Sequence, residues 1–491
     1  NNTSKLMATL IEQQPLYSYI PAGQDVIFTV SNNNIVTNPL NSRVKFIAEV
    51  RISDTLTPNP SNNSQVIGTF KTTPNNAAVG MFDFRPIIEN FVNADHKALS
   101  NSTYKTVGNK NLRIPLHLID KFSGNNNNFR YLQVKFKIEY FDNDTSSSTF
   151  DTLVTTDPRD TRSFNLWNAY LKYSDELSFG SGGSNNFFGY NPFKFNLNST
   201  EKQFLTNAPA IQYANIDDYG TAAILMINPI TQIAQVPSAP LGGTGTIRFK
   251  YYNDSGVELD FETIRLDDPN NGGFTYLDRG LAKNNIVYAG IFPANLRGWS
   301  TKFNANIANI SYYTVVVQTF NLATSLSITK TYTININCPT LKGFEPIRLC
   351  WLNQWGAWDY YTFTMKSIKT ISAKGTTYRQ LAGTWNESVY KIDGFKGGKK
   401  SFRVDATEKI KMNTDFVSES ESEWFEELIN SPEVYILEGY QADVDNSALN
   451  NYVTPVRLTS SSYTKKTIAN DKIMQYTFEV EKSKTLRTQS I

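Results

Sequence analysis

The chain has 491 residues, a formal net charge of +2, 19% charged residues and 13% aromatic residues. A balance near zero gives no whole-chain signal for a nucleic-acid partner or for a solvating acidic tail. No run approaches the ~20 apolar residues of a membrane span, and no basic segment followed by an apolar one opens the chain. We therefore predict neither a membrane span nor a signal peptide. Few charges and many rings are typical of β-rich extracellular, cell-surface or virion proteins.

Alternating apolar and polar residues predict strands in the first region, and the clearest case is residues 131–141. Segments 24–30 and 43–52 are also strand-like, and loops rich in Asn, Pro, Ser and Gly separate them. A short helix is predicted near residues 84–98, with Pro86 in its first turn. We expect this region, residues 1–160, to form a β-sandwich. The apolar stripe of the predicted helix is Ile87, Ile88, Phe91 and Val92.

The second region, residues 161–340, reads as a middle β-domain. It opens with a Gly/Ser-rich insert within 164–193, and strand-like segments follow it. The expected strands lie within residues 221–230, 245–254, 257–266, 312–321 and 329–338.

The third region, residues 341–491, begins with the aromatic stretch RLCWLNQWGAWDYYTF at 348–363. It predicts a hairpin whose turn lies at 353–357 and whose strands are apolar on both faces, so both faces must be covered. Burial in the core of this chain and a contact with another subunit are equally good interpretations, and a sugar-binding platform comes third. The candidate packing or interface residues are Trp351, Asn353, Trp355, Gly356, Trp358, Asp359 and Phe363.

The strongest helix signal covers residues 418–430. Ser418 and Glu421 have the spacing of a capping box, and Pro432 ends the helix. Strand-like segments follow to the end of the chain. We therefore expect a mostly β protein, with several β-sandwich-like domains in series and a few short helices. The candidate helix-packing residues, paired at i, i+4 spacing, are Trp424 with Leu428 and Phe425 with Ile429.

Residues with the usual chemistry of active sites are scarce. His96 and His117 are the only histidines, which excludes a histidine-rich zinc cluster and leaves at most one histidine-containing triad. Cys338 and Cys350 lie on expected consecutive strands, and two buried free thiols are favoured over one bridge.

Several short motifs come close to known sites without completing them. GFKGGKKS at 394–401 lacks the spacing of a phosphate loop and is better explained as a basic hairpin turn. GSGGS at 180–184 is not a nucleophile elbow, and segments 140–148 and 442–447 do not complete a calcium loop. A pair of carboxylates distant in sequence stays open. We predict no catalytic, cofactor-binding or metal-binding residues.

The aromatic stretch also contains the pattern W-L-N-x-x-G-x-x-D-x-x-x-F. It resembles a motif of virion structural proteins of tailed bacteriophages that infect Bacteroidetes, including the crAss-like group. Segments 82–92 and 424–436 are similar to blocks that accompany the motif in those proteins. The pattern is formed by Trp351, Leu352, Asn353, Gly356, Asp359 and Phe363.

This resemblance implies a tail structural subunit, most simply a ring, adaptor or hub protein of the tail tube below the portal. Its partners would be further copies in a closed ring of twelve-fold or six-fold symmetry, and other tail and portal-proximal virion proteins. DNA would meet it only in passage through a lumen. The protein would be assembled in the host cytoplasm and reside in the virion. The alternatives are a receptor- or glycan-binding tail fibre or surface protein and, less favoured, a polysaccharide-degrading tail enzyme.

Overall fold

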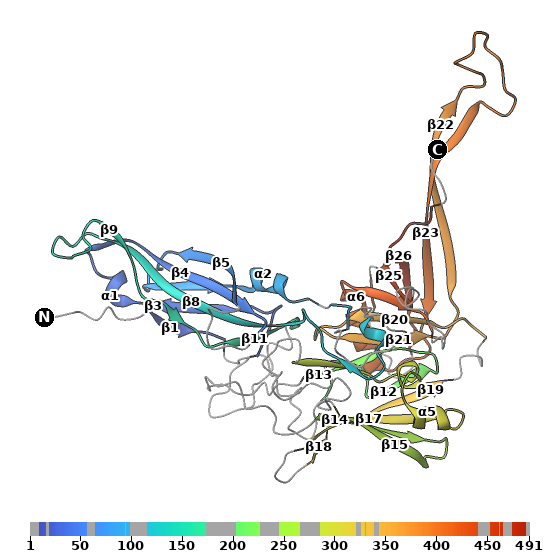
Figure 1. Ribbon diagram of the computed structural model, residues 1–491, viewed down its shortest axis with the longest axis horizontal. Coiled ribbons are helices and arrows are strands. Elements are labelled where there is room, and N and C mark those ends of the chain that lie inside the picture. The colour runs from blue at the N-terminus through green and yellow to red at the C-terminus, as the bar shows by residue number, and fades with distance from the viewer. Residues whose placement is uncertain are drawn as a thin grey trace. The chain divides into compact units, whose positions relative to one another are not determined.

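The computed structural model is mostly β and forms two compact units (Figure 1). The first comprises residues 1–212, 219–336 and 353–359, and the second comprises residues 213–218, 337–352 and 360–491. The predicted first domain and most of the predicted second domain therefore fall in the first unit, residues 213–218 and 337–340 fall in the second, and the predicted third region contributes residues 353–359 to the first. The described residues are 9–15, 19–55, 64–93, 95–98, 115–172, 203–225, 245–265, 285–320, 326–328, 330–337, 343–439, 452–460, 462–464 and 474–487.

The first unit opens with a β-sandwich. A seven-stranded sheet, in the order β2-β11-β8-β4-β5 with β9 and β10 also paired to β8, packs on the three-stranded sheet β1-β3-β6. Phe28 and Phe82 from the small sheet both lie within 6 Å of Phe136 from the large one, measured between ring centroids. The strands are β1 Leu10–Gln13, β2 Tyr19–Pro21, β3 Ile27–Ser31, β4 Asn41–Ser53, β5 Ser64–Thr72, β6 Val79–Asp83, β8 Phe129–Asp142, β9 Thr152–Thr155, β10 Arg159–Asp160 and β11 Phe164–Trp167.

Strand β8 confirms the alternation predicted for residues 131–141. Its even-numbered apolar side chains are buried, while its odd-numbered polar ones are half-buried. The helix predicted near 84–98 is much shorter: α2 covers Arg85–Ile88, a 3-10 turn covers Glu89–Phe91, and Val92 is extended. Four apolar residues give too little packing surface for a longer helix. One further short helix, α1, covers Asn33–Val36.

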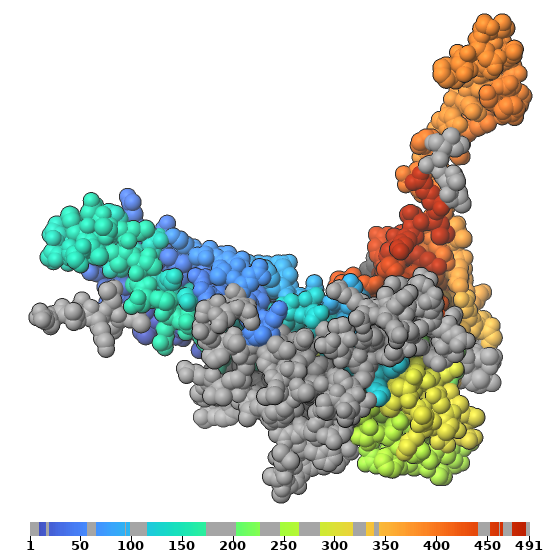
Figure 2. Space-filling model, in the orientation of Figure 1, coloured from blue at the N-terminus to red at the C-terminus, as the bar shows by residue number. Residues whose placement is uncertain are grey.

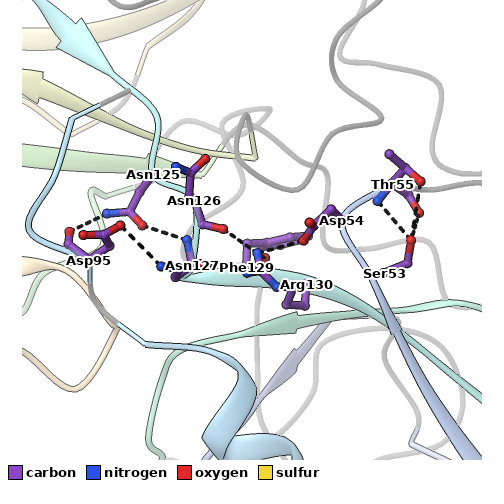
Figure 3. A network of polar contacts seen from close by, with 9 residues as sticks. All are labelled: Ser53, Asp54, Thr55, Asp95, Asn125, Asn126, Asn127, Phe129 and Arg130. Atoms are coloured by element: carbon purple, nitrogen blue, oxygen red, sulfur yellow. Dashed lines mark hydrogen bonds and ion pairs between the residues drawn. The ribbon is translucent and has the colours of Figure 1, made fainter. Parts of the chain in front are cut away.

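The asparagine-rich loop after β7 (Phe122–Ser123) shows how these polar segments are held (Figure 3). Asn125 Nδ2 donates to the Asp95 carbonyl at 2.5 Å, and Asn127 Nδ2 donates to the Asp95 carboxylate at 3.3 Å. Arg130 donates to Asn127 Oδ1 at 2.8 Å and forms a 3.0 Å ion pair with Asp54. Side-chain amides thus satisfy the loop locally, which is the role expected for asparagine in turns.

The remainder of the first unit contains two sheets. One has six strands, in the order β12-β19-β17-β14-β15 with β18 on β17, and the other has the order β13-β16-β7. Strand β7 lies in the predicted first domain but pairs with β16, which joins the two predicted domains by hydrogen bonds. The elements are β12 Ile211–Asn215, β13 Thr221–Leu225, β14 Gly245–Tyr252, β15 Glu258–Arg265, β16 Ile286–Gly290, α4 Pro293–Arg297, α5 Thr301–Asn306, β17 Tyr312–Phe320, β18 Leu326–Ile328 and β19 Tyr332–Asn337.

The second unit is built on a seven-stranded sheet in the order β21-β20-β24-β25-β26-β23-β22. Helix α6, Glu419–Asn430, confirms the helix predicted at 418–430, and both hydrogen bonds of the Ser418–Glu421 capping box are present. The strands are β20 Ile347–Leu352, β21 Trp358–Phe363, β22 Ile368–Gln380, β23 Gly398–Asn413, β24 Val434–Leu437, β25 Val453–Leu458 and β26 Thr477–Lys482.

Three sequence predictions lie outside the described residues. They are the Gly/Ser-rich segment 180–184, Cys338, and the acidic segment 442–447. Cys350 is described: it is buried, and burial raises the pKa of its thiol above the ordinary value.

Candidate functional site

The aromatic hairpin 347–363 turns around Asn353. The Oδ1 atom of Asn353 accepts hydrogen bonds from the backbone N–H groups of Trp355 and Ala357, both at 3.0 Å. Its Nδ2 atom donates to Asp359 Oδ1 at 2.9 Å and to the Leu205 carbonyl at 2.9 Å. Asn353 and Asp359 are both buried. Their side chains therefore satisfy polar groups of the turn that are shielded from solvent.

Gly356 and Trp355 at the tip of this hairpin belong to the first unit and fit closely against other residues of that unit. Gly356 has a φ of +71°, and a Cβ atom there would lie 1.7 Å from the Asn168 carbonyl oxygen. Trp355 stacks on Trp167 with ring centroids 5.8 Å apart, and its Nε1 donates to Asn207 Oδ1 at 2.9 Å. The side chain of Trp355 is 1% exposed.

Burial extends to the other predicted residues of the hairpin. Trp351, Trp358 and Phe363 are also buried. In the second unit, the ring centroid of Trp351 lies 4.9 Å from that of Trp424 in α6. The ring centroids of Phe425 and Phe478, which belongs to β26, are 5.5 Å apart. Leu428 is buried and Ile429 is half-buried. This burial favours packing within the chain over a subunit contact or a sugar platform at these residues.

The structure brings the two histidines together, which the sequence did not indicate. His96 Nδ1 lies 3.4 Å from His117 Nε2, and Trp358 packs against both imidazoles at centroid distances of 4.5 and 5.0 Å. His117 is fully buried. Within the described residues, no group of three His, Cys, Asp or Glu side chains is placed to hold a metal ion.

A second hairpin differs sharply from the first in its surroundings. We call residues 368–413 the arm: it consists of β22, β23 and the connecting segment 381–397. The two strands pair from Ile368↔Lys411 to Gln380↔Gly398, whereas β26 pairs with β23 only over residues 409–413. Apart from one isolated bridge, at Ala406, residues 398–408 have β22 as their one strand partner in the described structure. Figure 1 shows this ribbon running on beyond β25 and β26.

Large apolar side chains of the arm are exposed. Near its tip Trp385 is 85% exposed, Phe395 77% and Ile392 75%, and in Figure 2 the orange tip stands clear of the red strands of the same sheet. A group of large exposed apolar side chains of this kind often marks an interaction site. The other exposed large apolar residues of the arm are Ile368, Ile371, Leu381, Val389, Tyr390, Phe402 and Val404.

The arm is also strongly basic. It contains ten lysine or arginine residues and four acidic ones, a net charge of +6, so the remainder of the chain has a net charge of −4. The pairing of the strands places Arg379 directly opposite Lys399, and neither forms an ion pair with a described residue. Like charges opposite one another destabilise a hairpin, which an anionic partner would correct.

The motif GFKGGKKS lies at the tip of the arm. Gly397 and Gly398 have positive φ angles, and Gly398 is the first residue of strand β23. A phosphate loop would need a helix at this position. The prediction of a basic hairpin turn is therefore confirmed. In the segment before the motif, Ile392 forms an isolated bridge with Gly383.

Comparisons with known proteins identify no family. No family model matches the chain, and no curated protein matches it. Among solved structures, native E. coli alpha-2-macroglobulin aligns with 98% of this chain and 31% of its own, at 11% identity and a TM-score of 0.18. This chain thus spans about a third of that protein's chain, and the likeness is too low to carry an argument. No helix in the described part of the chain is both long and apolar enough to cross a membrane.

Proposed function

We propose that this protein is a structural subunit that assembles with copies of itself through the arm, and that it serves in a bacteriophage tail as a ring, adaptor or hub protein. The observation that carries this proposal is the exposed aromatic end of the arm. A two-stranded ribbon is only marginally stable in water, because it lacks a third strand or a covered face. A neighbouring molecule that covers the ribbon would supply both.

Three exposed side chains near the tip of the arm would gain free energy on burial. Burying a large apolar side chain contributes about 1.5–3 kcal/mol. Trp385, Phe395 and Ile392 are each at least three-quarters exposed, so most of that free energy is left for a contact with another molecule. Beyond the isolated bridge at Ala406, strand β23 extends by eight residues, 398–405, or about 26 Å at ~3.3 Å per residue, which is enough to reach an adjacent subunit.

The phage assignment rests on the resemblance of the aromatic hairpin and two further blocks to virion proteins of the crAss-like group. The residues of the motif have a common physical task here: Asn353, Gly356 and Asp359 build one tight buried turn. Such a turn would be retained for folding in any protein with this hairpin. We therefore propose a closed ring of six or twelve copies that contacts tail and portal-proximal proteins, with no catalytic role.

Glycan binding is the second candidate, because Trp385, Tyr390 and Phe395 are exposed rings on which a sugar could stack. A receptor-binding fibre would use them against a polysaccharide of the host surface. A polysaccharide-degrading enzyme would also need a carboxylate pair in a cleft, and the described residues single out no such pair.

The test is the assembly state of the purified protein, by light scattering and negative-stain imaging, beside a W385S/F395S variant. We expect rings for the natural chain and monomers for the variant. A natural chain that stays monomeric while binding capsular polysaccharide through these rings would favour the glycan-binding alternative. Shortening of that polysaccharide would favour the enzyme.

A further inference from the structure

The second unit contains a surface whose chemistry complements the arm. Residues 415–427 include six acidic residues and no basic one. On α6, Glu419, Glu423 and Glu426 follow i, i+4, i+7 spacing and form a stripe opposite the apolar face that contains Trp424 and Phe425. Glu419 and Glu423 are exposed and form no ion pair with a described residue.

An exposed apolar residue precedes this acidic stripe in the sequence. Phe416, two residues before the N-cap Ser418, is 63% exposed. The arm has the matching arrangement: Arg379 and Lys399 at the end of its strands, and exposed Trp385 and Phe395 in the segment that joins them. Both surfaces therefore combine charge with an exposed ring, and their charges are opposite in sign.

We infer that the arm of one copy docks on the acidic stripe of α6 and on Phe416 of the next copy. This inference rests on the proposed assembly and names the contact that produces it. Three observations favour a second copy as the partner: the like-charged pair Arg379↔Lys399, the division of charge between +6 on the arm and −4 on the rest of the chain, and the exposed rings on both surfaces.

The two surfaces are different parts of the chain, so the contact is head-to-tail. Repeated contacts of that type close into a ring when the rotation between copies allows it, and otherwise grow into a filament. Buried carboxylate–guanidinium contacts would fix the register, while the rings would contribute most of the buried apolar area.

The experiment uses two charge-reversed forms of the full chain, R379E/K399E and E419K/E423K. Each form places like charges across the proposed contact, so we expect each alone to lose the high-mass assembly and to run as a monomer. Mixed in equal amounts, the two forms should assemble again. The acidic arm of R379E/K399E can bind the basic helix of E419K/E423K, and the natural basic arm of E419K/E423K can bind the natural acidic helix of R379E/K399E. Copies would alternate around the ring, which suits an even number.

The matched control is K45E/K330E, which makes the same change in net charge as R379E/K399E at two exposed lysines outside the arm and α6. It should assemble as the natural chain does. Circular dichroism of all variants should stay unchanged, since every substituted side chain is exposed or lies at the solvent side of α6.

The outcomes separate the two proposals. A monomeric natural chain would overturn the proposed assembly itself. A natural chain that assembles, with R379E/K399E assembling equally well, would overturn the docking site alone. Loss of assembly in both variants without rescue on mixing would reject α6 as the partner surface. Binding of a short DNA duplex or of anionic phospholipid vesicles that depends on Arg379 and Lys399, without assembly, would replace the second copy by that anion.

Discussion

Two antiparallel hairpins follow one another in this chain and have opposite environments. The aromatic hairpin 347–363 buries its three tryptophans, whereas the arm exposes Trp385 almost completely. Both are rich in rings and both contain glycines with positive φ angles at their turns. The difference lies in what covers them. Residues of the same chain enclose the first hairpin, whereas over most of the arm, within the described residues, β22 and β23 pair with each other alone. Ring content alone therefore does not distinguish a core from an interaction surface.

The largest expected effect breaks the turn of the buried hairpin. Gly356→Ala should abolish folding or lower stability by about 4 kcal/mol or more, because it adds left-handed strain and a contact that only backbone movement can relieve. Gly398→Ala is the matched control: its φ is also positive, but nothing lies within 4 Å of the added Cβ, so only about 1 kcal/mol of strain is expected. Urea unfolding measures both. Equal costs would contradict the close fit of Gly356.

The tryptophans give a second comparison. Trp355→Ala should lower the free energy of unfolding by about 3–5 kcal/mol, because a buried ring and its hydrogen bond to Asn207 are lost. Trp385→Ala should change it by less than about 0.5 kcal/mol and weaken assembly instead. Thermal unfolding and light scattering on both variants check this. A stable, fully assembled Trp355→Ala protein would refute the packing argument.

A smaller effect concerns the helix that covers the buried hairpin. Ser418→Ala removes the cap of α6 and should cost about 1 kcal/mol. Ser420→Ala, two residues along the same exposed turn, should cost less, because the Ser420 hydroxyl caps no backbone group. The difference between the two unfolding free energies isolates the contribution of the cap, and its absence would show that packing of Trp424 alone holds the helix.

Thiol labelling compares the two hairpins without disturbing either. In a Cys338→Ser background, Cys350 should react with a thiol reagent only as fast as the protein opens, because it is buried and its thiol pKa is raised by burial. A cysteine introduced at Val389 of the arm should react at once in the monomer and more slowly in the assembly. Mass spectrometry of the natural protein, without reduction, tests the predicted absence of a bridge between Cys338 and Cys350.

Local patterns predicted local structure well. The alternation in β8 and the capping box of α6 depend on neighbours within a few residues, and both are present as expected. The helix predicted near 84–98 was wrong in length, because a short apolar stripe does not show where packing ends. Alternation along a strand does not identify its partner, and β7 pairs with β16, a strand far away in sequence and beyond the boundary expected near residue 160.

The chemistry of the arm was present in the sequence but hidden by averaging. A net charge of +2 for the whole chain contains a +6 segment, so the low total gives no whole-chain signal for the basic arm. The sequence predicts a basic hairpin turn at 394–401. It does not predict that the aromatic side chains near this turn are exposed to solvent. Period-two patterns show which side chains share a face of a strand. They do not show whether another layer lies on that face.

Sequence alone determined the class of structure, the capped helix and the turn at Asn353, because backbone periodicity and side-chain-to-backbone hydrogen bonds act over short separations. Only the tertiary structure decided which aromatic hairpin is enclosed. Enclosure depends on residues such as Trp167, Asn168 and Asn207, which lie about 150 to 190 positions away from the hairpin tip and carry no mark of that contact in their own neighbourhoods.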